Sequence, residues 1–197
     1  MANRRGRKRI YGANQKGQTN ANAAGTGIKD AVVSNTVRRE GHKIITEIAV
    51  DLGTSKADIE SKDTDLDIIG VDGGGNASLT TLTPAVNGYI IYVEMACLEA
   101  PTGGTEDIDL YLADEVTSTE AFDYAITSAT QTALVTSGGD WTLGRIDHYA
   151  VTHGTAHDLG SEDNGLYLVA GDGNTAAAYT QGKFVITIEG VAHLDDL

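Results

Sequence analysis

Short runs in which apolar and polar residues alternate recur along this chain from residue 44 onward, and no other feature constrains its fold as much. Successive side chains of a β-strand point to opposite faces of a sheet, so a period of two indicates strands with one buried face. Turn signals rich in Gly, Asn and Asp separate the runs. The clearest runs are 44–52, 88–100, 107–114 and 183–190, and shorter candidates are 66–71, 78–83, 121–126, 132–136, 141–152 and 165–171.

The spacing of apolar residues gives little indication of helices. Segment 118–135 could be helical, but Phe122, Tyr124 and Ile126 lie two residues apart, which favours a strand. The sequence also holds 24 Gly and 2 Pro. Many short strands with such turns predict an all-β fold, an antiparallel β-sandwich with a jelly-roll-like topology.

Charge divides the chain into two parts of opposite sign. Residues 1–43 hold ten of the 14 Lys and Arg and two of the 28 Asp and Glu, a net charge of +8, whereas residues 44–197 carry −22. From Ala2 to about Gly27 the chain has too few apolar side chains to fold alone, so we expect a disordered or extended basic arm. We therefore predict an arm with a transition segment, 1–43, and a sandwich domain, 44–197.

The transition segment, 28–43, holds Val32, Val33 and Val37, which predict a short piece docked on the sandwich. The candidate partner-binding residues lie at the start of the arm and are Arg4, Arg5, Arg7, Lys8 and Arg9. They could pair with phosphates, dock on an acidic protein surface or remain solvated. Protein docking is favoured and nucleic acid disfavoured, because the acidic sandwich would repel a nucleic acid. No apolar run of about 18 residues indicates a membrane span.

Three histidines form the candidate metal site: His148, His153 and His157. The last two would face one ion together on a helix, but Gly154 and the preceding strand pattern argue against a helix there. A polar loop is therefore expected, with no metal. Asp63, Asp65 and Asp67 begin like a calcium-binding EF-hand loop, but Ile68 stands where that loop needs Gly, and we expect outward strand positions and turn residues.

None of the remaining motifs indicates an enzyme. Cys97, the single cysteine, lies on an apolar strand face, where a thiol normally serves as inert packing. The Gly-x-Gly-x-x-Ala run from Gly171 to Ala176 follows a predicted strand, as a dinucleotide-binding loop would, but too few residues follow for a crossover helix. A hairpin loop is expected there, with no cofactor.

Two stretches, 106–135 and 164–190, resemble the small β-sandwich proteins that decorate or cement the capsids of tailed, podovirus-like bacteriophages, and the resemblance extends over most of 85–191. It implies a jelly-roll-like homotrimer on the capsid surface of the virion, contacts to the major capsid protein and no enzyme activity. The alternative is a head-fibre or tail appendage protein that binds a host-surface glycan. Its candidate aromatic platforms are Trp141, Tyr149 and Tyr167.

Overall fold

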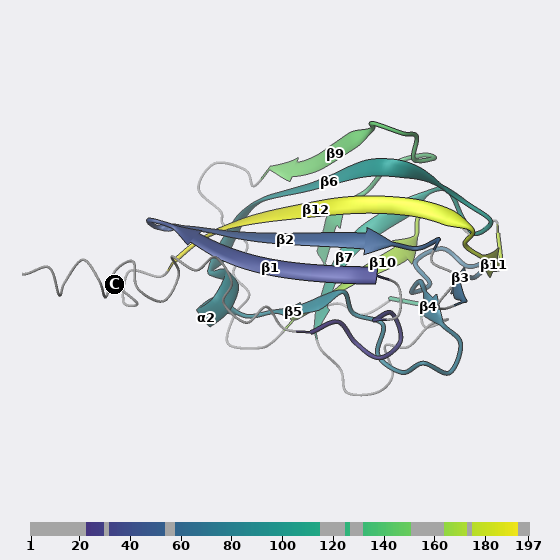
Figure 1. The fold of residues 1–197 in the computed structure, drawn as a ribbon, viewed down its shortest axis with the longest axis horizontal. Coiled ribbons are helices and arrows are strands. Elements are labelled where there is room, and N and C mark those ends of the chain that lie inside the picture. Colours follow the sequence, from purple (N-terminus) through teal and green to yellow (C-terminus); the bar gives the residue numbers. More distant parts are fainter. Residues whose placement is uncertain are drawn as a thin grey trace, which may run out of the picture.

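The computed structural model describes residues 23–29, 32–53, 58–114, 125–126, 132–150, 164–172 and 175–192, and these residues form three antiparallel sheets (Figure 1). The five-stranded sheet has the order β1 (Val32–Glu40), β2 (Lys43–Asp51), β12 (Gln181–Val191), β6 (Tyr89–Thr102), β9 (Ile146–Ala150). The four-stranded sheet has the order β5 (Thr80–Leu82), β10 (Asn164–Ala170), β7 (Ile108–Asp114), β8 (Thr132–Val135). A small sheet joins β11 (Ala177–Ala178), β3 (Ile59–Ser61) and β4 (Gly70–Val71).

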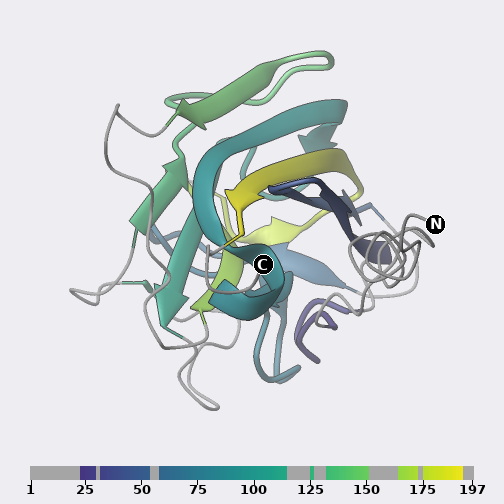
Figure 2. The ribbon, with the colours of Figure 1, turned by 90° about the vertical axis from the view of Figure 1, so that its left-hand side faces the viewer.

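The strand order is that of a jelly roll. From β2 the chain crosses to β5 in the other sheet, returns to β6, crosses to β7 and its neighbour β8, and then passes through β9 and β10 to β12. The two sheets that this path builds, β2-β12-β6-β9 and β5-β10-β7-β8, pack face to face (Figure 2). The predicted all-β, jelly-roll-like sandwich is therefore confirmed, with β1 added beside β2.

The strongest alternating runs became the long strands. β2, β6, β7 and β12 cover the four clearest runs, and β12 alternates buried and half-buried side chains along most of its length. The run 88–100 keeps one inward face only from Val93 onward, because the register with β12 shifts between Tyr92 and Ile90 and leaves Ile91 exposed. The run 66–71 yields only the two residues of β4, and 141–152 begins its strand at Ile146.

The core lies between the two large sheets. Phe184, Ile186, Val93 and Met95 point inward from β12 and β6 and belong to one continuous buried cluster with side chains of β7 and β10. Every residue of β10 is buried. The segment that leads to β5 pairs along one edge of this strand, since the amides of Ile69 and Leu79 donate to carbonyls of β10, and β7 pairs along the other edge. Strands buried on both faces read as continuous apolar runs, as β10 does.

A short helix closes one end of the sandwich. In α2 (Pro84–Asn87) the Thr83 side chain caps the first turn by accepting from the Val86 amide, and the buried Asn87 amide group donates to the Thr46 hydroxyl on β2. In the part of the chain that the structure describes, no helix has the length and apolar character to cross a membrane.

The beginning of the described chain belongs to the sandwich. Gly25 donates its amide to the Ser78 carbonyl, Gly27 bonds Asn76, and Ile28 is fully buried in the main core. The expectation of disorder up to about Gly27 is therefore wrong for residues 23–27. β1 is the docked segment expected within 28–43, and its hairpin with β2 spans the boundary that we predicted between residues 43 and 44.

Candidate functional site: the Arg145 network

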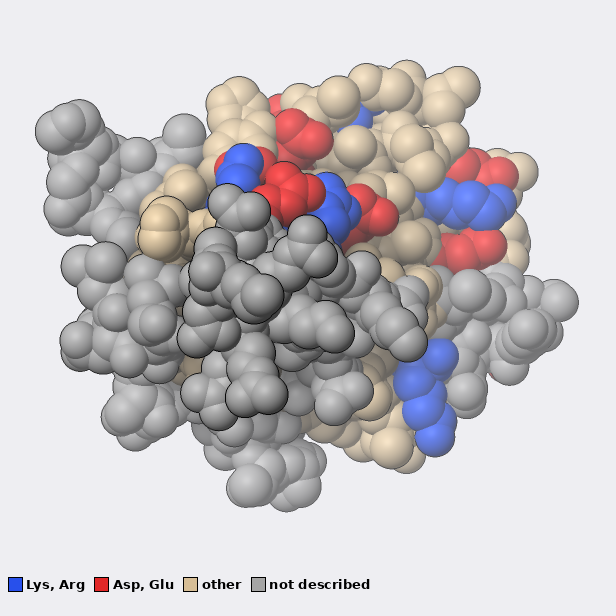
Figure 3. Space-filling view, turned by 60° about the vertical axis from the view of Figure 1, so that its left-hand side comes forward, with Lys and Arg blue, Asp and Glu red and all other residues tan. Residues whose placement is uncertain are grey.

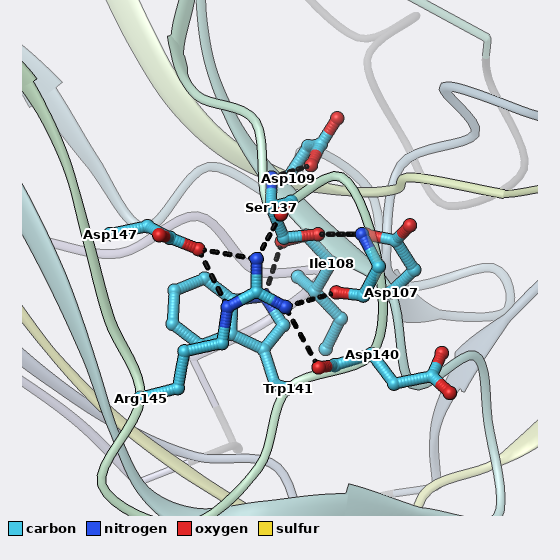
Figure 4. Close-up of polar contacts among 9 residues, drawn as sticks. Asp107, Ile108, Asp109, Ser137, Asp140, Trp141, Arg145 and Asp147 are labelled. Atoms are coloured by element: carbon cyan, nitrogen blue, oxygen red, sulfur yellow. Dashed lines mark hydrogen bonds and ion pairs between the residues drawn. The ribbon is translucent and has the colours of Figure 1, made fainter.

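A dense group of polar contacts, some buried and some part-buried, lies where the chain passes from β8 to β9, and Trp141 anchors it (Figure 4). The Trp141 side chain is buried, and its indole N–H donates to the Ile108 carbonyl on β7 at 2.7 Å. Its ring and that of Phe184 pack edge to face, with 5.5 Å between ring centres, and its backbone amide donates to the backbone carbonyl of Glu106. The loop is thereby pinned to both large sheets.

Arg145 closes the loop over this indole. Its Nη1 donates to the carbonyls of Gly139 and Asp140 at 2.7 and 2.8 Å, and its Nη2 donates to the carbonyl of Ser137. Its Nε and Nη2 both reach Asp147 Oδ2, at 2.8 and 2.7 Å. A guanidinium carries five N–H donors, and these contacts occupy all of them. Arg145 has no donor left for a substrate, so we assign it a structural role.

Two buried carboxylates lie beside the loop at the start of β7. The Ser137 hydroxyl donates to Asp107, and the Ser137 amide donates to Asp109 Oδ1 at 2.7 Å. Burial raises the pKa of the Asp109 carboxyl, the Ser137 amide opposes this rise, and the charge of Asp107 adds to it. Close carboxylates that share one serine resist being charged together.

A second polar cluster joins the loop before β7 to the small sheet. The Ser61 hydroxyl accepts from the Thr105 amide and donates to the Thr175 carbonyl. The Thr105 hydroxyl bonds Asp172 Oδ1 at 2.6 Å, and the Tyr179 hydroxyl donates to the Thr105 carbonyl. Burial raises the pKa of Tyr179 far above its ordinary value, so this phenol stays protonated.

Of the three histidines considered as a metal site, only His148 lies among the described residues. His148 lies on the outer face of β9 and stacks on Tyr92, with 5.9 Å between ring centres. Within the described ranges no group of three or more His, Cys, Asp or Glu side chains could hold a metal ion. His153 and His157 lie outside the described residues, as do Arg4, Arg5, Arg7, Lys8 and Arg9 of the arm.

The structure tests the other candidate residues one by one. Cys97 is buried and burial raises the pKa of its thiol, which confirms its role as packing. Asp67 was expected to point outward or sit in a turn, but it is only 3% exposed, so the outward alternative is wrong for it. Asp63 and Asp65 lie at the surface beside it, in the turn before β4. After Gly171 the chain enters β11 only two residues beyond Thr175, as a loop would and a crossover helix would not.

Two of the three aromatic side chains considered for sugar binding are unavailable. Trp141 and Tyr167 are buried in the core, where they contact protein on all sides, and Tyr149 is half-buried against it. The glycan-binding alternative therefore loses two of its three candidate platforms.

The residues that sequence reasoning missed are Arg145, Asp107 and Asp109. Asp107 and Asp109 alternate with the apolar residues of their strand, which suggests a solvent-facing side, but Ser137 of the β8–β9 loop bonds both of them and both are buried. One signal was present: Arg145 is one of only four cations after residue 43. An isolated Arg in an acidic domain suggests a specific internal partner.

The chain has no significant match to a protein family, to a curated protein or to a solved structure.

Proposed function

We propose that this chain is a non-enzymatic structural protein of a virion, a decoration or cement protein that binds and stabilises the outer surface of a capsid shell. Its partner is the major capsid protein, it assembles as a homotrimer on the shell, and its basic arm anchors the acidic sandwich to neighbouring subunits. The jelly roll supports this proposal by analogy, since viral capsid proteins use this architecture among many others.

The observation that carries the proposal is how the Lys and Arg residues are distributed between the sandwich and the arm. Within the sandwich, Arg38 pairs with Glu40 and Glu47, Lys43 with Glu189, Lys183 with Asp51 and Glu99, and Arg145 with Asp147. Figure 3 shows the result on one face, where most blue side chains lie beside red ones. Residues 1–22 hold six Lys and Arg and no Asp or Glu. Residues 1–22 are thus a run of cations with no acid among them, a charge pattern that suits an anchor to an acidic surface.

Co-sedimentation of the full-length protein with capsids stripped of accessory proteins tests the proposal. We expect binding to saturate at a copy number set by the icosahedral lattice. Reversing the charge of Arg4, Arg5 and Arg7 to Glu should weaken binding, most strongly at low salt, whereas Lys at the same three positions should preserve it. Absence of binding by the wild type, or a few copies at a single vertex, would contradict a decoration role.

A further inference from the structure

Strand β9 ends the five-stranded sheet with hydrogen-bonding groups that the described chain leaves unpaired. The Cys97 amide donates to the Arg145 carbonyl, and Ala96 lies opposite Ile146 in the same register. In an antiparallel pair the bonded residues alternate with residues whose N–H and C=O point away from the neighbouring strand. Asp147 and Tyr149 therefore bond β6, and Ile146 and His148 turn their backbone groups outward.

No described element lies beyond this edge. In Figures 1 and 2, β9 forms one margin of the sandwich. Within the described part of the chain, the outward N–H and C=O groups of Ile146 and His148 have no backbone hydrogen-bond partner. Unpaired strand edges of this kind are templates for a further strand.

An exposed apolar patch adjoins the same edge. Of the four large hydrophobic side chains that the described residues expose, three meet here: Leu98 is 56% exposed, Leu143 74% and Ile146 55%. Ile146 lies opposite Ala96 on the outer face, and Leu98 follows two residues later on that face. The Gly144 amide bonds the Cys97 carbonyl, which brings Leu143 alongside. Apolar side chains gathered in this way mark interaction surfaces.

Most charges beside the patch are already paired, and Glu94, opposite His148, accepts from the Tyr92 hydroxyl. Arg145 pairs with Asp147 at 2.7 Å, and Lys183 pairs with Glu99 at 2.8 Å. A strongly charged partner, such as a polyanion or the basic arm of another copy, would gain little from this rim. The edge instead fits an extended segment that is apolar on one face and carries no net charge there. β9 itself presents Ile146 and the ring of His148 on that face, with no Lys, Arg, Asp or Glu beside them on the strand face.

We propose that β9 joins two copies of this chain edge to edge across a two-fold axis, so that their five-stranded sheets become one continuous sheet. The rotation makes the two strands antiparallel, and the outward N–H and C=O groups of Ile146 and His148 meet the same groups of the other copy. The two apolar patches then adjoin on the outer face. This contact is separate from the proposed decoration function. It uses only one sheet edge of each copy, so the other surfaces can still form trimer contacts or bind the capsid shell.

The test is the molar mass of the full-length protein in solution, measured by light scattering and sedimentation over a range of concentrations. His148→Pro removes an outward N–H without removing a bond to β6, and edge strands tolerate such a proline. Ile146→Lys adds a charge to the patch. We expect the wild type to have about twice the mass of each variant, with association weakened about tenfold or more. The matched control, Ala49→Lys, places the same charge on the exposed outer face of β2, away from the edge, and should keep the wild-type mass.

Hydrogen exchange adds a readout that depends on the edge itself. Protection of the Ile146 and His148 amides should rise with protein concentration in the wild type and in Ala49→Lys, and should stay low at Ile146 in His148→Pro. Equal masses for wild type and both edge variants would overturn the proposal. So would dissociation by Ala49→Lys to the same extent, because it would assign the contact to the sheet face.

Discussion

The guanidinium carbon of Arg145 lies 5.2 Å from the centre of the Trp141 ring. The indole N–H is held by the Ile108 carbonyl, and the ring is covered by a cation whose donors go to the loop carbonyls and to Asp147 on β9. The pair thus links the β8–β9 connection to β7 and to the core at once. Because β9 begins directly after Arg145, this Arg145–Trp141 pair, which acts as a clamp, also fixes the position of the sheet edge.

Replacing Arg145 by Lys should destabilise the protein although the charge is kept. A lysine cannot supply the planar set of donors that bonds Ser137, Gly139 and Asp140, and it leaves carbonyls without partners. We expect a loss of about 2–3 kcal/mol in the free energy of unfolding, measured with denaturant. Arg38→Lys is the control, since its pairs with Glu40 and Glu47 are exposed and should contribute less than about 1 kcal/mol. Equal effects of the two substitutions would contradict the clamp.

Asp109→Asn should stabilise the protein at neutral pH. Burial raises the pKa of Asp109, so the native state binds this proton more tightly than the unfolded chain. Stability from this group therefore falls as the pH rises from the unfolded value, about 3.9, through the raised native pKa. Asparagine carries no charge and its Oδ1 can still accept from the Ser137 amide.

Denaturant unfolding at several pH values measures this effect. The advantage of Asp109→Asn should be greatest above the raised native pKa and should shrink as the pH falls below it, where the native wild-type carboxyl is also neutral. Asp140→Asn, at an exposed side chain, is the control and should change the free energy of unfolding far less at neutral pH. A variant less stable than wild type at neutral pH would show that the carboxylate charge is needed.

The sequence predicted the architecture because alternation reports directly on strands with one buried face. β12 obeys it closely and β2 obeys it from Thr46 onward, and the spacing of such runs with Gly-rich turns was enough to indicate a sandwich. The pattern misleads where a second layer covers the outer face. Asp107 and Asp109 alternate as if they faced water, but residues far along the chain bury them.

Other local features depended on contacts that no short-range pattern encodes. Ile91 is exposed because a bulge shifts the register against β12, a strand about a hundred residues away. Ile28 follows a stretch too polar to fold alone and is buried only because Ser78 and Asn76 bind the turn before it. Arg145 stood out because cations are rare in this part of the sequence. Three of its acceptors are backbone carbonyls of the loop, and backbone acceptors cannot be identified from the types of the residues that carry them.

Gly190→Ala should be strongly destabilising, because a methyl group at this position would collide with the Asn87 carbonyl of α2. The main chain of α2 cannot withdraw without disturbing the bond from Asn87 to Thr46. Thermal or denaturant unfolding should show a loss of about 2–3 kcal/mol. Gly41→Asn is the control: it lies in the β1–β2 turn with φ 66° and open space around it, and Asn tolerates that conformation at a cost below about 1 kcal/mol.

The arm and the sandwich should separate at Ala23 in a truncation series. Deleting residues 1–22 removes six cations but none of the described contacts, so the free energy of unfolding should stay within about 0.5 kcal/mol of wild type. Deletion through residue 29 also removes Ile28, which is fully buried, and the amides that bond Ser78 and Asn76. Ile28→Ala in the full chain should by itself cost about 2–5 kcal/mol. If the shorter deletion destabilised as much as Ile28→Ala, residues 1–22 would belong to the folded unit and could not serve only as an anchor.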